Sequence, residues 1–187
     1  MSNFEFVFSL FGLLLGLALA EVLGGLGRAL QARRKVRIGW LTPLLGLVVA
    51  LDLTSFWTIA WTVRDSLPPS YFSLLCGFVL TGIYYLAARL VFPHDPAEWP
   101  DYDPYYFAHK RVVLGGVLVC NLLALAGQWA LGNAPIASQS DWFSTGLFFP
   151  LLALAIWAPG KRANLVLLVF LALYYPVLAL TGLLIGP

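Results

Sequence analysis

Asp52 is the residue whose type and position point most clearly to chemistry. It lies near the middle of the apolar stretch 39–62, too deep for its short side chain to reach water if that stretch crosses a bilayer. Ser55 and Thr62 share its face of a helix and Thr58 lies at the edge of that face, so a polar strip runs from Asp52 toward one end. This strip can bind a proton or a small cation. The alternative is a structural role, in which a protonated Asp52 forms a hydrogen bond across a helix interface.

A second acid, Glu21, lies in the apolar stretch 4–27. A carboxylate in hydrocarbon is costly, so Glu21 must face protein or water. Two interpretations are open. Glu21 can bind an ion together with Asp52, or it can reach back toward the basic segment that follows and pair with Arg28, seven residues further on.

Two amides lie seven residues apart in the stretch 111–132, Asn121 and Gln128, and they share one face of a helix. Amides inside a helix bundle commonly form hydrogen bonds between helices. If these two meet Asp52, they form the polar lining of an ion path. Two tyrosine pairs, Tyr84-Tyr85 and Tyr174-Tyr175, raise the question of an inverted repeat between the two halves, which the sequence alone leaves open.

A row of small residues at four-residue spacing precedes and follows Glu21: Gly12, Gly16, Ala20 and Gly24. Small side chains allow two helix backbones to approach closely in a membrane. We therefore expect this row to pack against another helix, within one protomer or between protomers.

The segment 93–110 combines acidic, aromatic and histidine side chains, and its prolines stand at positions 93, 96, 100 and 104. Since proline interrupts a helix interior, we expect a loop with ordered, aromatic-rich turns at the inner membrane surface. His94 and His109 lie among its acids, but their spacing fits no recognised metal site. A solvated loop is one interpretation, and a surface that binds lipid head groups is the other.

The sequence contains no P-loop, no G-x-S-x-G and no G-x-G-x-x-G motif, and no nucleophile–base motif. No apolar stretch contains a histidine that could hold a haem. Cys76 and Cys120 lie inside apolar stretches, where they act as small apolar side chains. We predict no catalytic residue, no metal site and no cofactor, which favours a protein that is not an enzyme.

These residues must be positioned by helices in a membrane. The chain has 187 residues, of which 60% are hydrophobic and 11% charged, and its mean hydropathy is +0.85. Six stretches are long and apolar enough to cross a bilayer or nearly so: 4–27, 39–62, 70–92, 111–132, 142–158 and 163–185. The sequence thus predicts an all-α, polytopic membrane helix bundle with six transmembrane helices in a single domain, 1–187. Within the shortest stretch, Pro150 favours a kink or a break.

The basic residues predict the orientation of the bundle. Ten of the eleven Lys and Arg residues lie in the segments 28–38, 89–111 and 159–162, which fall on one side if there are six spans. The positive-inside rule makes these segments cytoplasmic and both termini non-cytoplasmic, with the chain in the cell inner (plasma) membrane. Basic residues that flank apolar stretches form no polar face, so we expect no nucleic-acid partner.

The function we favour from the sequence is permeation or transport of a small ion or proton through the polar strip around Asp52. Glu21, Ser55, Asn121 and Gln128 are the further candidates for ion or proton binding. One alternative is a non-catalytic membrane subunit or scaffold, which associates as a homo-oligomer or with a partner through its small-residue helix face. The weaker alternative is a lipid-binding protein or membrane enzyme that uses the loop 93–110.

Overall fold

The chain folds into helices, which a computed structural model describes for residues 3–95, 98–134, 136 and 139–185. The helices are α1 (Asn3–Ala32), α2 (Leu41–Thr62), α3 (Tyr71–Arg89), α4 (Tyr102–Ala130), α5 (Gln139–Trp157) and α6 (Lys161–Ile185). Within the described residues there is no β-strand, only an isolated bridge between Arg37 and Asp101. The predicted all-α class is confirmed.

Within the part of the chain that the structure describes, five helices are long and apolar enough to cross a membrane: α1, α2, α3, α4 and α6. The described apolar part of α5, Thr145–Trp157, is shorter than a full span, although the helix itself continues through Pro150. The helices are therefore compatible with an integral membrane protein.

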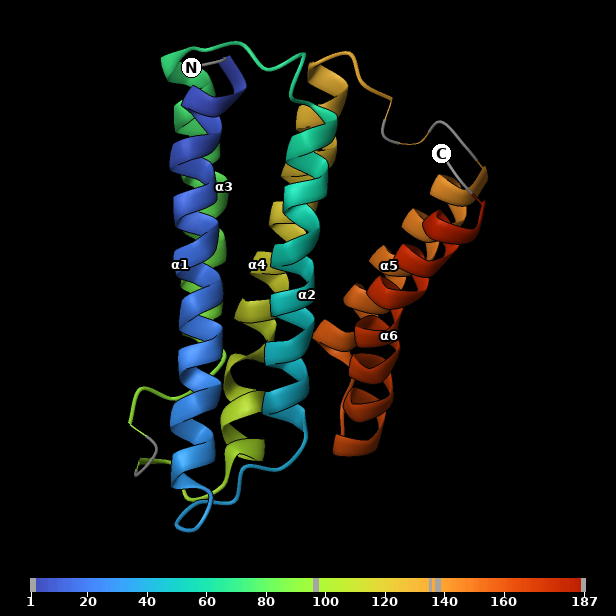
Figure 1. Ribbon diagram of the computed structural model, residues 1–187. Helices are drawn as coiled ribbons and strands as arrows, with labels where there is room; N and C mark the ends of the chain where they lie inside the picture. The colour runs from blue at the N-terminus through green and yellow to red at the C-terminus, as the bar shows by residue number, and fades with distance from the viewer. Residues whose placement is uncertain (1–2, 96–97, 135, 137–138, 186–187) are drawn as a thin grey trace.

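Helix α2 lies at the centre of the arrangement and packs against α1, α4 and α6. Its inward face carries apolar side chains with almost no exposed surface, among them Leu45, Val49 and Leu53. Helices α1 and α3 pair on one side of α2, and the α5–α6 hairpin lies on the other. Figure 1 shows that this hairpin is inclined to α2. The start of α5 and the end of α6 therefore lie farther from α2 than the short turn that joins α5 to α6.

Close packing on α1 depends on Gly25, which the predicted row of small residues does not include. A Cβ atom built on Gly25 would lie 2.6 Å from the ring of Phe92, and one on Gly46 of α2 would lie 3.0 Å from the same ring. Phe92 is buried between these two glycines. The two small residues make room for an aromatic ring that joins the end of α3 to α1 and α2.

The predicted row lies on another face of α1. Gly16, Ala20 and Gly24 are exposed, and among the described residues nothing comes within 4 Å of a Cβ atom built on Gly16. The row is therefore not the seam between helices within the described protomer, because the buried face of α1 is formed by Leu15, Ala18, Val22, Gly25 and Ala29. Association through the row between protomers stays a prediction.

The predicted loop 93–110 is shorter than expected, because α4 begins at Tyr102. The Asp101 side chain caps this helix by accepting a hydrogen bond from the Asp103 backbone N–H at 2.9 Å. Pro104 lies in the first turn, where a missing N–H costs no helical hydrogen bond. The presence of a proline therefore did not exclude a helix over 102–110.

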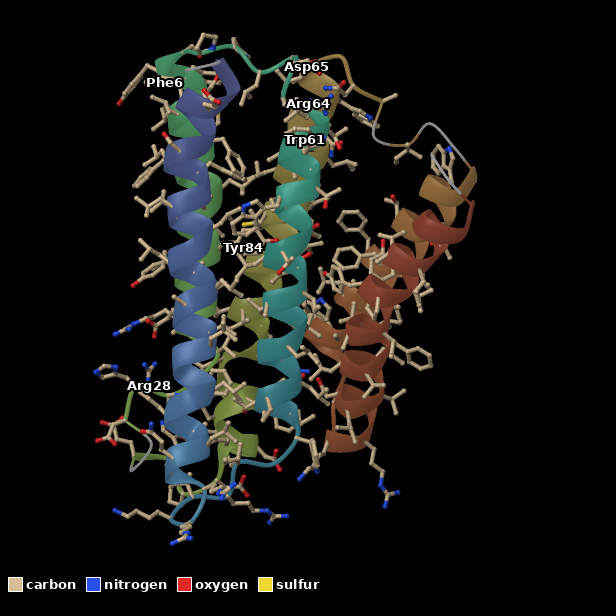
Figure 2. The ribbon with its side chains drawn as sticks, viewed as in Figure 1. Phe6, Arg28, Trp61, Arg64, Asp65 and Tyr84 are labelled. Atoms are coloured by element: carbon tan, nitrogen blue, oxygen red, sulfur yellow. The ribbon has the colours of Figure 1, made fainter. Side chains whose placement is uncertain are left out.

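The connections 33–40, 90–95 with 98–101, and 158–160 lie at one end of the molecule, with the start of α1 and the end of α6 at the other. Two of these connections are joined: the Arg37 N–H donates to the Pro100 carbonyl at 2.8 Å, and the Tyr102 N–H donates to the Arg37 carbonyl at 3.0 Å. We call this end the basic end. Figure 2 shows Arg28 toward it, with Arg64 at the opposite end.

Candidate functional site around Asp52

Asp52 lies in the middle of α2 with 1% of its surface exposed, and its carboxyl group accepts hydrogen bonds from three other helices. The Tyr84 hydroxyl of α3 donates to Oδ2. The Tyr175 hydroxyl of α6 donates to Oδ1 at 2.7 Å. The Asn121 amide of α4 lies 3.2 Å from Oδ1 and 3.1 Å from Oδ2. One carboxyl group therefore joins four helices.

Tyr84 and Asn121 are themselves held in place by further contacts. Tyr84 is fully buried, and its ring meets that of Phe56 edge to face with centroids 4.8 Å apart. The Asn121 amide also contacts the Tyr84 hydroxyl at 3.3 Å and the Val117 carbonyl at 3.0 Å. Figure 2 shows Tyr84 near the middle of the bundle. These two donors are thus preorganised around Asp52.

This arrangement suits a group that gains and loses a proton. Three donors stabilise an ionised carboxylate, which is costly when it is isolated from water. A tyrosine hydroxyl is both a donor and an acceptor, so it can rotate to accept a hydrogen bond once the carboxyl group is protonated. Both protonation states therefore have hydrogen-bond partners.

A cavity of about 560 Å³ reaches Asp52. It lies between α2 and the inclined α5–α6 hairpin, and α4 contributes to it through Asn121. The wall that α2 forms runs from Leu51 to Ile59, about 12 Å along the helix axis. Because both α2 and α6 line the cavity from the Asp52 level toward their C-terminal ends, the cavity extends away from the basic end.

Two of the predicted residues lie at this site beside Asp52. Asn121 contacts the carboxyl group directly, and Ser55 lines the cavity while its hydroxyl donates to the Asp52 backbone carbonyl at 2.7 Å. Gln128 lies two turns beyond Asn121 and lines a different cavity, of about 380 Å³, between α1, α2, α3 and α4. The structure does not bring Gln128 to Asp52.

Glu21 is also separate from the site. Its Oε1 atom lies 3.0 Å from Nη2 of Arg28 and 3.0 Å from Nη1 of Arg89, which joins α1 to the end of α3. Of the two interpretations, the structure shows the pairing with Arg28. Arg89 also lies near His94, whose Nδ1 is 3.5 Å from Nη2. This ion-pair group stands near the basic end.

Sequence reasoning did not assign Tyr84 and Tyr175 to the site. The sequence did contain a signal for them. Tyrosine is common at membrane interfaces, but Tyr84 and Tyr175 both lie deep within apolar stretches, which is unusual. A tyrosine at that depth needs a hydrogen-bond partner for its hydroxyl. Asp52 is the acceptor that the structure supplies.

A second buried polar group, which we call the Lys110 cluster, was also missed. Lys110 is 4% exposed, and its ammonium group donates to the carbonyls of Ala155 at 3.0 Å and Ala158 at 2.8 Å and to Oδ1 of Asn164 at 2.6 Å. The Tyr106 hydroxyl donates to the same Asn164 oxygen at 2.8 Å. A cation is stabilising at a helix C-terminus. The cluster therefore fixes the basic end of the α5–α6 hairpin to α4.

Among the residues that the structure describes, no three His, Cys, Asp or Glu side chains come together as a metal site would require. The comparisons with known proteins give no family for this chain. No family model matches it, and neither a curated protein nor a solved structure matches it. The Asp52 site is therefore the feature of the molecule that points to a function.

Proposed function

We propose that this protein is a membrane transporter or channel for protons, with Asp52 as the group that binds and releases the proton. The observation that carries the proposal is a fully buried carboxyl group, hydrogen-bonded from three helices, at the end of a cavity. Ionisable residues at this depth mark ion and proton paths. A proton suits the site better than a metal cation, because the Asn121 amide nitrogen faces the carboxylate as a donor.

The α5–α6 hairpin is the part that changes access to Asp52 in this proposal. The Lys110 cluster and an ion pair between Lys161 and Asp103 hold the hairpin at the basic end. Farther along α6 from this end, Tyr175 contacts Asp52, and beyond that contact the cavity lies between the hairpin and α2. A pivot about the anchored end would break the Tyr175 contact and expose more of the Asp52 carboxyl group to the cavity that reaches it.

The proposed orientation places the basic end in the cytoplasm and the chain in the plasma membrane. Eight of the ten basic residues of the three predicted inner segments belong to the connections at that end or to the helix turn beside them, and the other two, Lys110 and Arg111, lie in the third turn of α4. The positive-inside rule supports this choice. The cavity would then extend from Asp52 toward the outer side.

The direct test is proton flux into proteoliposomes under an imposed membrane potential, measured with a pH-sensitive dye inside the vesicles. We expect flux in the parent protein and at least a tenfold loss in Asp52→Asn, which keeps the size of the side chain but cannot ionise. The matched control is Asp65→Asn, which makes the same change at an exposed carboxylate of the opposite end. No flux in the parent, or equal flux in Asp52→Asn, would overturn the proposal.

A second function is favoured by the exposed row on α1. Gly16, Ala20 and Gly24 present a smooth helix surface that could pack against a second protomer or a membrane partner, as expected of a scaffold or non-catalytic subunit. Replacing Gly16 by Leu should then disrupt co-purification of differently tagged copies or of the partner. The matched control is Gly127→Leu on α4, also an exposed helical glycine with nothing within 4 Å.

A further inference from the structure

The cavity beside Asp52 has one aromatic wall. Phe148 of α5 and Tyr174 and Tyr175 of α6 line it, and their rings form a compact group. The ring centroids of Phe148 and Tyr174 are 5.3 Å apart, those of Tyr174 and Tyr175 are 5.3 Å apart, and those of Phe148 and Tyr175 are 6.2 Å apart. Aromatic faces attract cations through their quadrupole.

The opposite wall presents hydrogen-bond acceptors and one acid. The Thr54 hydroxyl donates to the Ala50 carbonyl at 2.8 Å, and the Ser55 hydroxyl donates to the Asp52 carbonyl at 2.7 Å. Since these hydroxyl protons are engaged within α2, the oxygen lone pairs are what the side chains can offer to a ligand. Among the described residues that line the cavity, Asp52 is the sole carboxylate, and none of them is a lysine or arginine. The electrostatic character of the cavity therefore favours a positive ligand.

The size of the cavity indicates an organic ligand. A volume of about 560 Å³ falls within the range of small-molecule sites, roughly 300–1,000 Å³. A proton or a bare metal ion needs none of this space. Leu51, Ile59, Pro176, Leu178 and Ala179 complete the lining, so the ligand must also be lipophilic.

We propose that the cavity binds a lipophilic organic cation of the aromatic quaternary ammonium type. The cationic head would lie against the rings of Phe148 and Tyr174, with Asp52 as its counter-charge, and the apolar part would extend along α2 and α6. The inference deepens the proposed function and rests on it in one respect: the organic cation and the proton compete for the same carboxyl group, so binding of one releases the other.

The test uses the full-length protein in lipid nanodiscs, with benzyltrimethylammonium as the probe and its neutral carbon isostere, neopentylbenzene, as the comparison. We expect the cation to bind at least tenfold more tightly than the isostere by isothermal titration calorimetry, and Asp52→Asn to remove that preference. Tyr174→Leu and Phe148→Leu should each weaken cation binding severalfold. The matched control is Phe170→Leu, since Phe170 is an exposed ring of α6 that does not line the cavity.

Equal binding of the cation and its isostere by the unaltered protein would overturn the inference, because it would show an apolar cavity that a lipid chain can fill. That comparison needs no variant, so it holds even if a substitution prevents folding. The outcome is separable from that of the flux experiment. Proton flux without cation preference refutes this inference alone, whereas cation preference without proton flux refutes the proposed proton transport and leaves the cation site in place.

Discussion

The hydroxyl group of Tyr175 on α6 donates a 2.7 Å hydrogen bond to Oδ1 of Asp52 on α2, across 123 positions of the chain. It is the polar contact that joins the α5–α6 hairpin to the acid at the centre of the bundle. Toward the basic end the Lys110 cluster holds the same hairpin, and away from that end the cavity separates the hairpin from α2. The Tyr175–Asp52 contact therefore lies where the packed and the open parts of this interface meet.

Replacing Tyr175 by Phe should remove this contact without changing the shape of the ring. We expect the free energy of unfolding in detergent micelles to fall by about 0.6 kcal/mol and by no more than about 1.7 kcal/mol, the average and the maximum measured for hydrogen bonds between helices in a membrane protein. The control is Tyr85→Phe, the same change at a half-buried tyrosine outside the Asp52 site. Equal losses in the two variants would show that the Tyr175 hydroxyl has no special role.

Replacing Lys110 by Met should loosen the hairpin at its anchored end. Methionine fills similar space but leaves the Ala155 carbonyl without the ammonium donor, at a cost of about 1–3 kcal/mol for a buried acceptor left unsatisfied. The Ala158 carbonyl still accepts a hydrogen bond from the Asn164 amide at 2.9 Å. We expect a lower unfolding temperature and faster proteolysis at the α5–α6 turn. Lys35→Met, at an exposed lysine of the same end, is the control. If both variants melt like the parent, the Lys110 cluster does not anchor the hairpin.

The two adjacent glycines of α1 should respond oppositely to alanine. Gly25→Ala places a methyl group 2.6 Å from the Phe92 ring, and such overpacking costs about 1–3 kcal/mol. Gly24→Ala meets only the Arg28 side chain at 3.6 Å, so the helix should gain up to about 1 kcal/mol from the better helix former. Chemical unfolding of the two variants measures both effects. A similar loss in each would mean that the Gly24 face also packs against protein.

Much of the fold could be predicted from the sequence because a lipid-spanning helix needs a long apolar stretch, and such stretches are visible directly. Asp52 could be selected for the same reason, since a carboxylate in the middle of 39–62 stands out. Asn121, whose meeting with Asp52 the sequence left open, contacts it. The start of α4 was misplaced because Pro104 was treated as a helix breaker, although the first turn of a helix tolerates proline.

What could not be predicted depends on the relative rotation of helices. Glu21 and Gln128 are as polar as the residues at the site, but their faces of α1 and α4 meet other partners. Gly24 and Gly25 differ by one position, or about 100° around the helix, and only Gly25 faces Phe92. Lys110 looked like one more basic residue of a cytoplasmic loop. Its buried role follows from α5 ending beside it, which local sequence does not encode.

The last prediction concerns the orientation of the bundle in the membrane, which cysteine labelling can test. The background protein would carry Cys76→Ser and Cys120→Ala, because both native thiols are free. Into it, Gln31→Cys and Ser66→Cys would each place one thiol, at exposed positions of opposite ends of the molecule. Both changes leave every basic residue in place, so the charge bias that directs insertion is preserved.

In intact cells, a membrane-impermeant maleimide should label the thiol at position 66 and leave the thiol at position 31 unlabelled. Permeabilised cells should show both labels, which controls for thiols that are merely buried. Labelling of position 31 alone from outside would reverse the orientation and place the mouth of the Asp52 cavity toward the cytoplasm, since the cavity extends toward the end that carries position 66. Protons and organic cations would then enter the cavity from the opposite side to the one proposed.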